Sequence, residues 1–153
     1  MSAREVYRVN LFKWPLWVNA PFYGSATRAV EDGVLTITLT GGDSYAIVNF
    51  TGLVPGERYV WSVDVRSDTT GGPSTQLFEK NWTPIASDST ANGRARIAFT
   101  APSDGMVIIR FDGINREKGS SRSFSRPQLE LESTWDESLP FFYYGTMPDP
   151  RSA

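Results

Sequence analysis

The chain has 153 residues and a formal net charge of −2, and it contains neither cysteine nor histidine. That length fits a single domain of ordinary size. The missing residue types exclude a disulfide framework, a thiolate nucleophile, a zinc finger, a Ser-His-Asp triad and an HExxH metal site. The small negative charge gives no reason to expect a nucleic acid or an anionic membrane as partner.

The N-terminal region does not read as a targeting segment. Its apolar stretch is interrupted by Arg8, Lys13 and Pro15, and no small-residue cleavage site follows it. No stretch of the chain approaches the roughly 20 apolar residues of a transmembrane helix. We therefore expect synthesis in a cytoplasm, without a signal peptide and without membrane insertion.

The first clear strand pattern alternates apolar residues with threonine over residues 34–40. A second run covers residues 44–50, and the Gly-Gly-Asp sequence at 41–43 is a turn signal. We therefore predict a hairpin over residues 34–50. Pro55-Gly56 suits the centre of a type II turn, and it precedes an alternating strand at 58–66. The residues of that strand expected to face the core are Tyr59, Trp61, Val63 and Val65.

The rest of the chain continues in short strands separated by Gly, Pro and Asp turns, without a long amphipathic helix. Residues 81–92 are predicted to form an irregular loop that carries Trp82. About seven or eight short strands at this spacing indicate a β-sandwich or a β-barrel. The further strands are predicted at residues 75–80, 94–100, 106–112 and 123–131.

Three landmarks resemble a known class of domain. Residues 51–65 read Thr-Gly-Leu-Val-Pro-Gly-Glu-Arg-Tyr-Val-Trp-Ser-Val-Asp-Val, which is similar to the Leu-x-Pro-Gly-x-x-Tyr-x-x-Ser-x-x-Val stretch of carbohydrate-binding-module-like (galactose-binding-like) jelly rolls. Asn10-Leu11-Phe12 resembles the Asn-Leu-Leu/Phe that opens them. Residues 124–134 resemble the closing strand of such domains in bacteriophage tail and virion proteins, where Arg-Pro-Gln-Leu-Glu-x-Gly-Ser-Thr precedes a Pro/aromatic tail. Glu132 stands here where Gly is usual.

The resemblance covers residues 8–145 and implies an all-β fold. We expect a single jelly-roll β-sandwich of about eight antiparallel strands with extended N- and C-terminal arms. The expected organisation is an N-terminal arm with the first strand at 1–28, the jelly-roll sandwich at 29–131, and a Pro/aromatic C-terminal arm at 132–153.

The phage resemblance suggests a non-enzymatic virion structural protein, either a minor tail protein or a capsid decoration protein. Such a protein would dock through its arms onto other virion proteins, in multiple copies within a symmetric assembly, and would be made in the host bacterial cytoplasm. The aromatic tail would otherwise pack back on its own sandwich, because it cannot stay exposed in water. The expected interface residues are Trp14, Trp17, Phe22, Tyr23, Trp135, Phe141, Phe142, Tyr143 and Tyr144.

The alternative function is a module that binds a glycan on the host surface. Sugar binding needs exposed rings and a few fixed polar groups. In a purely structural role, Trp14, Trp17 and Trp82 would cover the ends of the sandwich or meet a neighbouring subunit. The candidate rings are Trp14, Trp17, Tyr23, Tyr45 and Trp82.

A polar face is the second part of this alternative. Polar side chains point outward from the strands predicted at residues 58–66, 106–112 and 123–131. If these strands are neighbours, their outward side chains form a mosaic of opposite charges that could hold a polar ligand. The other interpretation is a solvated face whose cross-strand ion pairs are worth about 0.2–1 kcal/mol each. Asp112, Gln128 and Glu130 would extend the face. The possible ligand residues are Ser62, Asp64, Arg66, Trp82 and Arg110.

No cofactor and no catalytic residue are expected. Structural calcium, which is common in such jelly rolls, stays open as the alternative. Glu31-Asp32, Asp43 and the pair Glu130 and Glu132 could contribute ligands, although no Asp-rich spacing singles them out. Paired-carboxylate catalysis would need a deep cleft, which a small sandwich lacks. We therefore expect that the protein is not an enzyme.

Overall fold

The computed structural model describes residues 7–12, 22–31, 34–67, 73–112, 121–135 and 145–148. These segments contain ten β-strands and no helix. The strands are β1 (Tyr7–Asn10), β2 (Phe22–Glu31), β3 (Val34–Phe50), β4 (Arg58–Ser67), β5 (Thr75–Phe78), β6 (Pro84–Asp88), β7 (Gly93–Thr100), β8 (Val107–Asp112), β9 (Ser121–Leu131) and β10 (Gly145–Pro148).

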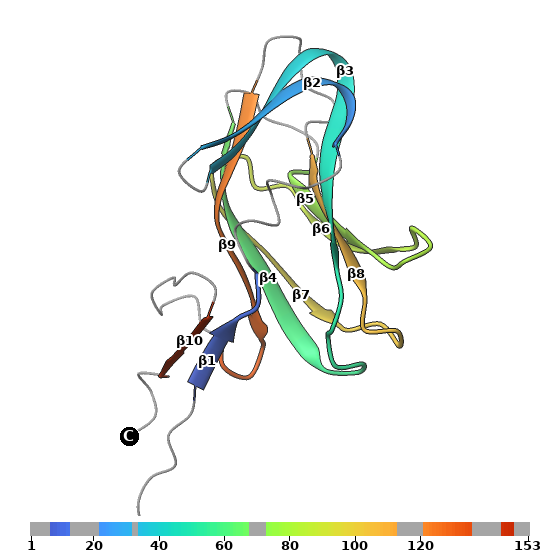
Figure 1. Ribbon diagram of the computed structural model, residues 1–153, viewed down its shortest axis with the longest axis vertical. Coiled ribbons are helices and arrows are strands. Elements are labelled where there is room, and N and C mark those ends of the chain that lie inside the picture. Colours follow the sequence, from blue (N-terminus) through green and yellow to red (C-terminus); the bar gives the residue numbers. More distant parts are fainter. Residues whose placement is uncertain are drawn as a thin grey trace, which may run out of the picture.

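Most of the strands form one antiparallel series in the order β6-β5-β8-β3-β9-β4-β7, and β2 pairs along β3. The series makes two layers because β3 belongs to both. Its first half pairs with β9 and its second half pairs with β8. In Figure 1, β3 arches over one end with β2 beside it, while β4 and β9 run together on one side and β5, β6 and β8 lie on the other. The predicted jelly-roll β-sandwich is confirmed.

The hairpin predicted over residues 34–50 is wrong, because this segment is the single 17-residue strand β3. The Gly-Gly-Asp sequence at 41–43 lies where the β2–β3 ladder is interrupted. Gly24 pairs with Ser44, but Ala26 pairs with Leu39. The extra residues of β3 form a bulge, which bends a strand. The turn-forming residues thus carry β3 from one layer into the other without reversing the chain.

Trp61 lies at the centre of the core. Its side chain is fully buried, and its ring centroid lies 5.2 Å from that of Phe12 and 5.7 Å from that of Phe111. Phe111 contacts Phe124 across 5.1 Å. All four residues predicted to face inward from β4 are buried, so this part of the prediction is confirmed. Val60 and Ser62 on the opposite side of the strand are buried as well.

The turn before β4 has the predicted conformation. Gly56 has a φ of 84°, and the backbone N–H of Glu57 donates to the carbonyl of Val54 at 3.1 Å. A positive φ at the third residue of the turn is what a type II turn requires, and glycine adopts it without steric cost. The Pro55-Gly56 prediction is therefore confirmed.

Strand β6 lies inside the stretch 81–92, which was predicted to be irregular. It pairs with β5 at one edge of its layer, and its residues are half-buried or exposed. An edge strand of this kind buries neither face completely, so its sequence shows little apolar alternation. That is why the sequence pattern missed it.

Candidate functional site

The structure separates the predicted ligand residues into two groups. Ser62, Asp64 and Arg66 lie on β4, which is flanked by β7 and β9. Arg110 lies on β8, which is flanked by β3 and β5 in the other layer. Trp82 lies in the turn between β5 and β6, and both Trp82 and Arg110 contact the ring of Tyr45 on β3. The single polar face expected from the sequence is therefore two faces, because β4 and β8 are not neighbours.

An aromatic group lies on the outer surface of β3, β5 and β8. Trp82 is 42% exposed, and the centroid of its ring lies 5.2 Å from that of Phe78 and 6.4 Å from that of Tyr45. Ile47 and Ile108 form a small buried cluster with Phe78, against which Tyr45 packs. The rings thus pack on a buried apolar cluster, and part of Trp82 faces solvent.

The backbone that carries Trp82 is held in an uncommon conformation. Its φ is 66°, which few residues other than glycine adopt. The N–H of Trp82 donates to the carbonyl of Glu79 at 2.8 Å, and the N–H of Glu79 donates to the carbonyl of Thr83 at 2.9 Å. The side chain of Asn81 accepts from the N–H of Thr83 at 3.2 Å. These bonds fix the position of the exposed ring.

Arg110 adds a positive charge to this group. Its guanidinium carbon lies 3.9 Å from the centroid of the Tyr45 ring, which is a close cation–π contact. Gln76 of β5 is the partner of Arg110 in the ladder. The outer surface of this layer therefore combines two partly exposed rings with a cation and an amide.

The turn that carries Trp82 also borders an open polar hollow of about 460 Å³. The far wall of the hollow is the turn between β7 and β8, where Asp104 accepts from the N–H of Met106 at 3.1 Å. The lining residues are Glu79, Lys80, Asn81, Pro102, Ser103 and Asp104.

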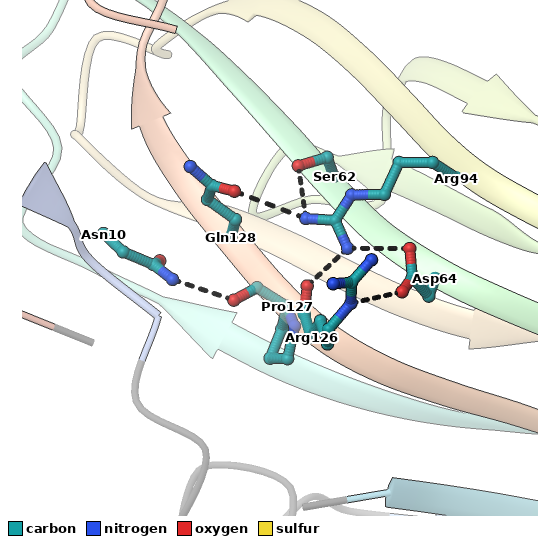
Figure 2. A network of polar contacts seen from close by, with 7 residues as sticks. All are labelled: Asn10, Ser62, Asp64, Arg94, Arg126, Pro127 and Gln128. Carbon is teal, nitrogen blue, oxygen red and sulfur yellow. Dashed lines mark hydrogen bonds and ion pairs between the residues drawn. The ribbon is translucent and has the colours of Figure 1, made fainter. Parts of the chain in front are cut away.

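The second face, on β4, β7 and β9, is organised by Arg94 (Figure 2). Its Nη1 donates to Asp64 Oδ1 at 3.1 Å and to the carbonyl of Arg126 at 2.6 Å. Its Nη2 donates to Ser62 Oγ at 3.0 Å and to Gln128 Oε1 at 3.4 Å. Arg94 lies in the strand predicted at residues 94–100, but no local signal in the sequence showed that this strand lies next to β4.

The guanidinium charge of Arg94 is largely buried, which costs free energy of solvation. Burial lowers the pKa of its guanidinium, the charge and hydrogen bond of Asp64 raise that pKa, and the neighbouring charge of Arg126 lowers it. An arginine side chain nevertheless remains protonated in proteins. Hydrogen-bond acceptors therefore offset the cost of burying this charge, and β4 and β9 supply two each.

A chain of polar contacts continues from this face to the segment after β9. Gln128 donates to Glu130 Oε1 at 2.7 Å, and Thr134 Oγ1 donates to Glu130 Oε2 at 2.7 Å. The guanidinium of Arg96 lies 6.0 Å from the ring centroid of Trp135. Residues 134 and 135 therefore lie against the layer formed by β4, β7 and β9.

Asn10 is a polar residue whose role the sequence did not indicate. It is fully buried, donates to the carbonyl of Pro127 at 3.0 Å and accepts from the N–H of Leu129 at 3.0 Å. It also accepts from the N–H of Phe12 at 3.1 Å. These bonds join the end of β1 to β9 and place Phe12 in the core. The Asn-Leu-Phe landmark marked the position of Asn10 in the sequence but not its structural role.

The predicted partner residues lie mostly outside the described part of the chain. Phe22 and Tyr23 belong to β2, where their backbones pair with Ala46 and Tyr45. Trp135 is half-buried beside Arg96. The others, Trp14, Trp17, Phe141, Phe142, Tyr143 and Tyr144, fall outside the described residues.

Two further features are absent from the described segments. No group of three acidic side chains there gathers in a way that could hold a metal ion. The same segments contain no helix with the length and hydropathy of a membrane span.

No protein-family model matches the sequence, and no curated protein matches it. The solved structures do contain similar chains. One described as "CBM4 structure and function" is 21% identical over 74% of this chain and 78% of that chain, with a TM-score of 0.56. The second N-terminal cellulose-binding domain of Cellulomonas fimi β-1,4-glucanase C is 16% identical over 86% of this chain and 96% of its own length, with a TM-score of 0.53.

A phage protein is also among the similar structures. The enzymatically active domain of tailspike protein 4 from bacteriophage CBA120 is 13% identical over 75% of this chain, with a TM-score of 0.52. The match covers 20% of that chain, so this protein corresponds to about one fifth of it. At these levels of identity, similarity in structure establishes the fold. The chain thus has the jelly-roll fold of the carbohydrate-binding modules.

Proposed function

We propose that this protein is a non-catalytic module that binds a glycan through the aromatic group around Trp82. The observation that carries the proposal is the exposed Trp82 ring on a turn whose hydrogen bonds fix it beside Tyr45. A planar ring can stack on the apolar face of a sugar, and neighbouring polar groups then orient the hydroxyls. Arg110 and the hollow beside the turn supply such groups.

The comparisons support this function over the virion role that was the first expectation. A cellulose-binding domain and a xylan-binding domain share the fold. The phage context is supported by the tailspike, in which the match covers 20% of an enzymatically active domain. The alternative interpretation of the sequence, a glycan-binding module, is therefore preferred.

The test measures binding of the full chain to soluble neutral polysaccharides, namely xylan, glucomannan and hydroxyethylcellulose, by affinity electrophoresis. Trp82→Ala should weaken binding to the preferred polymer about tenfold or more, the size expected when a central aromatic anchor is truncated. Trp82→Phe keeps a stacking ring and should retain most of the affinity. Thr83→Ala, at an exposed residue of the same turn that does not line the hollow, is the matched control.

The melting temperature of each variant separates loss of the ring from loss of the turn. An unchanged affinity in a folded Trp82→Ala protein would contradict the site. Absence of binding by the wild type to all three polymers would contradict the function for this class of glycan.

Virion docking through the terminal segments stays a second candidate function. The tailspike is the observation that favours it, because the same fold occurs there in a phage tail protein. Deletion of residues 136–153 should reduce incorporation into particles if the C-terminal segment is the latch. Incorporation at normal copy number after this deletion would contradict the docking function.

A further inference from the structure

An open hollow lies on the layer opposite to Trp82, between β4, β7 and β9. Its volume is about 540 Å³, within the range of about 300–1,000 Å³ that is usual for small-molecule sites. Each of the three strands or its adjoining turn contributes to the wall. The lining residues are Asp64, Val65, Arg66, Asn92, Gly93, Arg94, Ser125 and Arg126.

The charges around the hollow are unbalanced. Its lining contains three guanidinium groups and a single carboxylate, although the whole chain carries a net charge of −2. That carboxylate, Asp64, is shared: Oδ1 accepts from Arg94 at 3.1 Å and Oδ2 accepts from Arg126 Nε at 2.5 Å. Within the described residues, the guanidinium of Arg66 has no hydrogen-bond or ion-pair partner. The hollow is therefore a local region of positive potential.

Arg126 is held toward the hollow by an irregularity in β9. Ser62 pairs with Gln128, but Asp64 pairs with Ser125, so Arg126 and Pro127 together lie opposite Val63 as a bulge. Bulges of this kind re-aim a side chain. Arg126 has a φ of 50°, and Arg94 holds its carbonyl at 2.6 Å (Figure 2). The side chain of Arg126 nevertheless stays 52% exposed.

We propose that this hollow binds an oxyanion substituent, a carboxylate or a sulfate, of an acidic glycan. Arg66 and Arg126 contact the oxyanion through their exposed guanidinium groups, which match the geometry of such oxygens with paired N–H donors. Arg94 is a positioning residue, because its Nη atoms already serve Asp64, Ser62, Gln128 and the Arg126 carbonyl. The inference rests on the proposed function only in taking the ligand to be a glycan.

The test measures the affinity of the full chain for three soluble polymers by isothermal titration calorimetry. Polygalacturonate supplies carboxylates, dextran sulfate supplies sulfates, and dextran is the neutral control. At least one acidic polymer should bind. Its affinity should fall as sodium chloride is raised from 50 to 300 mM, because the Debye length shortens from about 14 Å to about 6 Å. Comparison of the two acidic polymers decides between carboxylate and sulfate. Equal affinity for dextran would overturn the proposal.

Two substitutions locate the site. Arg66→Gln and Arg126→Asn should each weaken binding of the acidic polymer about tenfold or more, as expected for a lost charge-assisted contact. Asparagine tolerates the positive φ at position 126. Arg58→Gln is the matched control, because Arg58 is equally exposed but pairs with Glu132 at 3.0 Å away from the hollow. An equal loss in all three variants would reduce the effect to net charge and overturn the site.

Failure of this inference can be distinguished from failure of the proposed function. Trp82→Ala should leave binding of the acidic polymer unchanged, because Trp82 lies on the other layer. Loss of acidic-polymer binding in Arg66→Gln together with unaltered neutral binding supports the inference alone. If Trp82→Ala reduces neutral binding while the arginine variants bind every polymer like the wild type, the proposed function stands and the inference fails.

Discussion

Among the glycines of positive φ in the described segments, Gly105 leaves the least room for a side chain. Its φ is 69°, and a Cβ added there would lie 2.4 Å from the carbonyl oxygen of Leu53. The carbonyl of Gly105 in turn accepts from the N–H of Leu53 at 3.0 Å. This close approach joins the turn before β4 to the turn before β8, so the backbone contact depends on the absence of a side chain.

Gly105→Ala should lower the free energy of unfolding by more than the about 1–2 kcal/mol that a left-handed conformation costs an ordinary residue, because the contact with Leu53 is added. Gly52→Ala is the control, since Gly52 has a φ of 88° with no atom within 4 Å of its added Cβ. Urea denaturation of both variants measures the difference. Equal losses would show that the backbone contact imposes no extra cost.

At the scale of strands, one buried threonine connects the two layers of the sandwich. Thr75 of β5 accepts from Trp61 Nε1 of β4 at 3.1 Å and donates to the carbonyl of Arg110 in β8 at 2.8 Å. Without this acceptor, the indole N–H would be buried with no acceptor among the described residues, which is costly in a protein interior. The bond therefore joins β4 to β5 and β8 through the core.

Thr75→Val, which keeps the shape of the side chain, should lower the free energy of unfolding by about 1–3 kcal/mol. Thr36→Val removes the bond between Thr36 Oγ1 and Ser123 Oγ at 3.0 Å, which is only partly buried. Water can replace that partner, so the control should lose about 1 kcal/mol or less. Chemical denaturation compares the two, and a Thr75→Val loss no larger than that of Thr36→Val would contradict the argument.

The strands also show how an element is bent to serve two layers. The irregularity in β3 near residues 41–43 turns the strand from β9 toward β8. The irregularity in β9 near Arg126 re-aims a side chain at the hollow. Both occur where the pairing register shifts, and in both the extra residues change direction without ending the strand.

At the scale of the whole molecule, the N-terminal segment completes the sandwich. Phe12 is 1% exposed and packs against Trp61. Asn10 hydrogen-bonds to β9 on one side of it, and β1 pairs with β10 through Tyr7 and Pro148 (Figure 1). Segments distant in sequence from the central strands therefore contribute to the core and to its border.

Phe12→Ala should lower the free energy of unfolding by about 3–5 kcal/mol, the usual cost of truncating a buried phenylalanine. Val54→Ala, at a residue that is 56% exposed, should change it by about 0.5 kcal/mol or less. Thermal and urea unfolding check both values. A Phe12→Ala protein as stable as the control would show that the segment does not complete the core in solution.

The candidate sites show where local information ends. The sequence identified Trp82, Tyr45, Asp64 and Arg66 by residue type and alternation, and each lies on a surface that a ligand can reach. It joined Arg110 to the wrong group, since the pattern of one strand does not reveal its neighbours. Arg94 and Arg126 reach Asp64 from strands far away in the sequence, and only the strand order brings these residues together.

The sequence by itself determined the all-β class, the inward face of β4 around Trp61 and the turn at Pro55-Gly56. These features depend on a period of two residues and on the conformational limits of proline and glycine, and both act within a few residues. The tertiary structure decided that β3 spans two layers, that β4 pairs with β7 and β9, and that Arg94 and Arg126 share Asp64. Strand order depends on the free energy of packing the whole core, and no short segment contains that information.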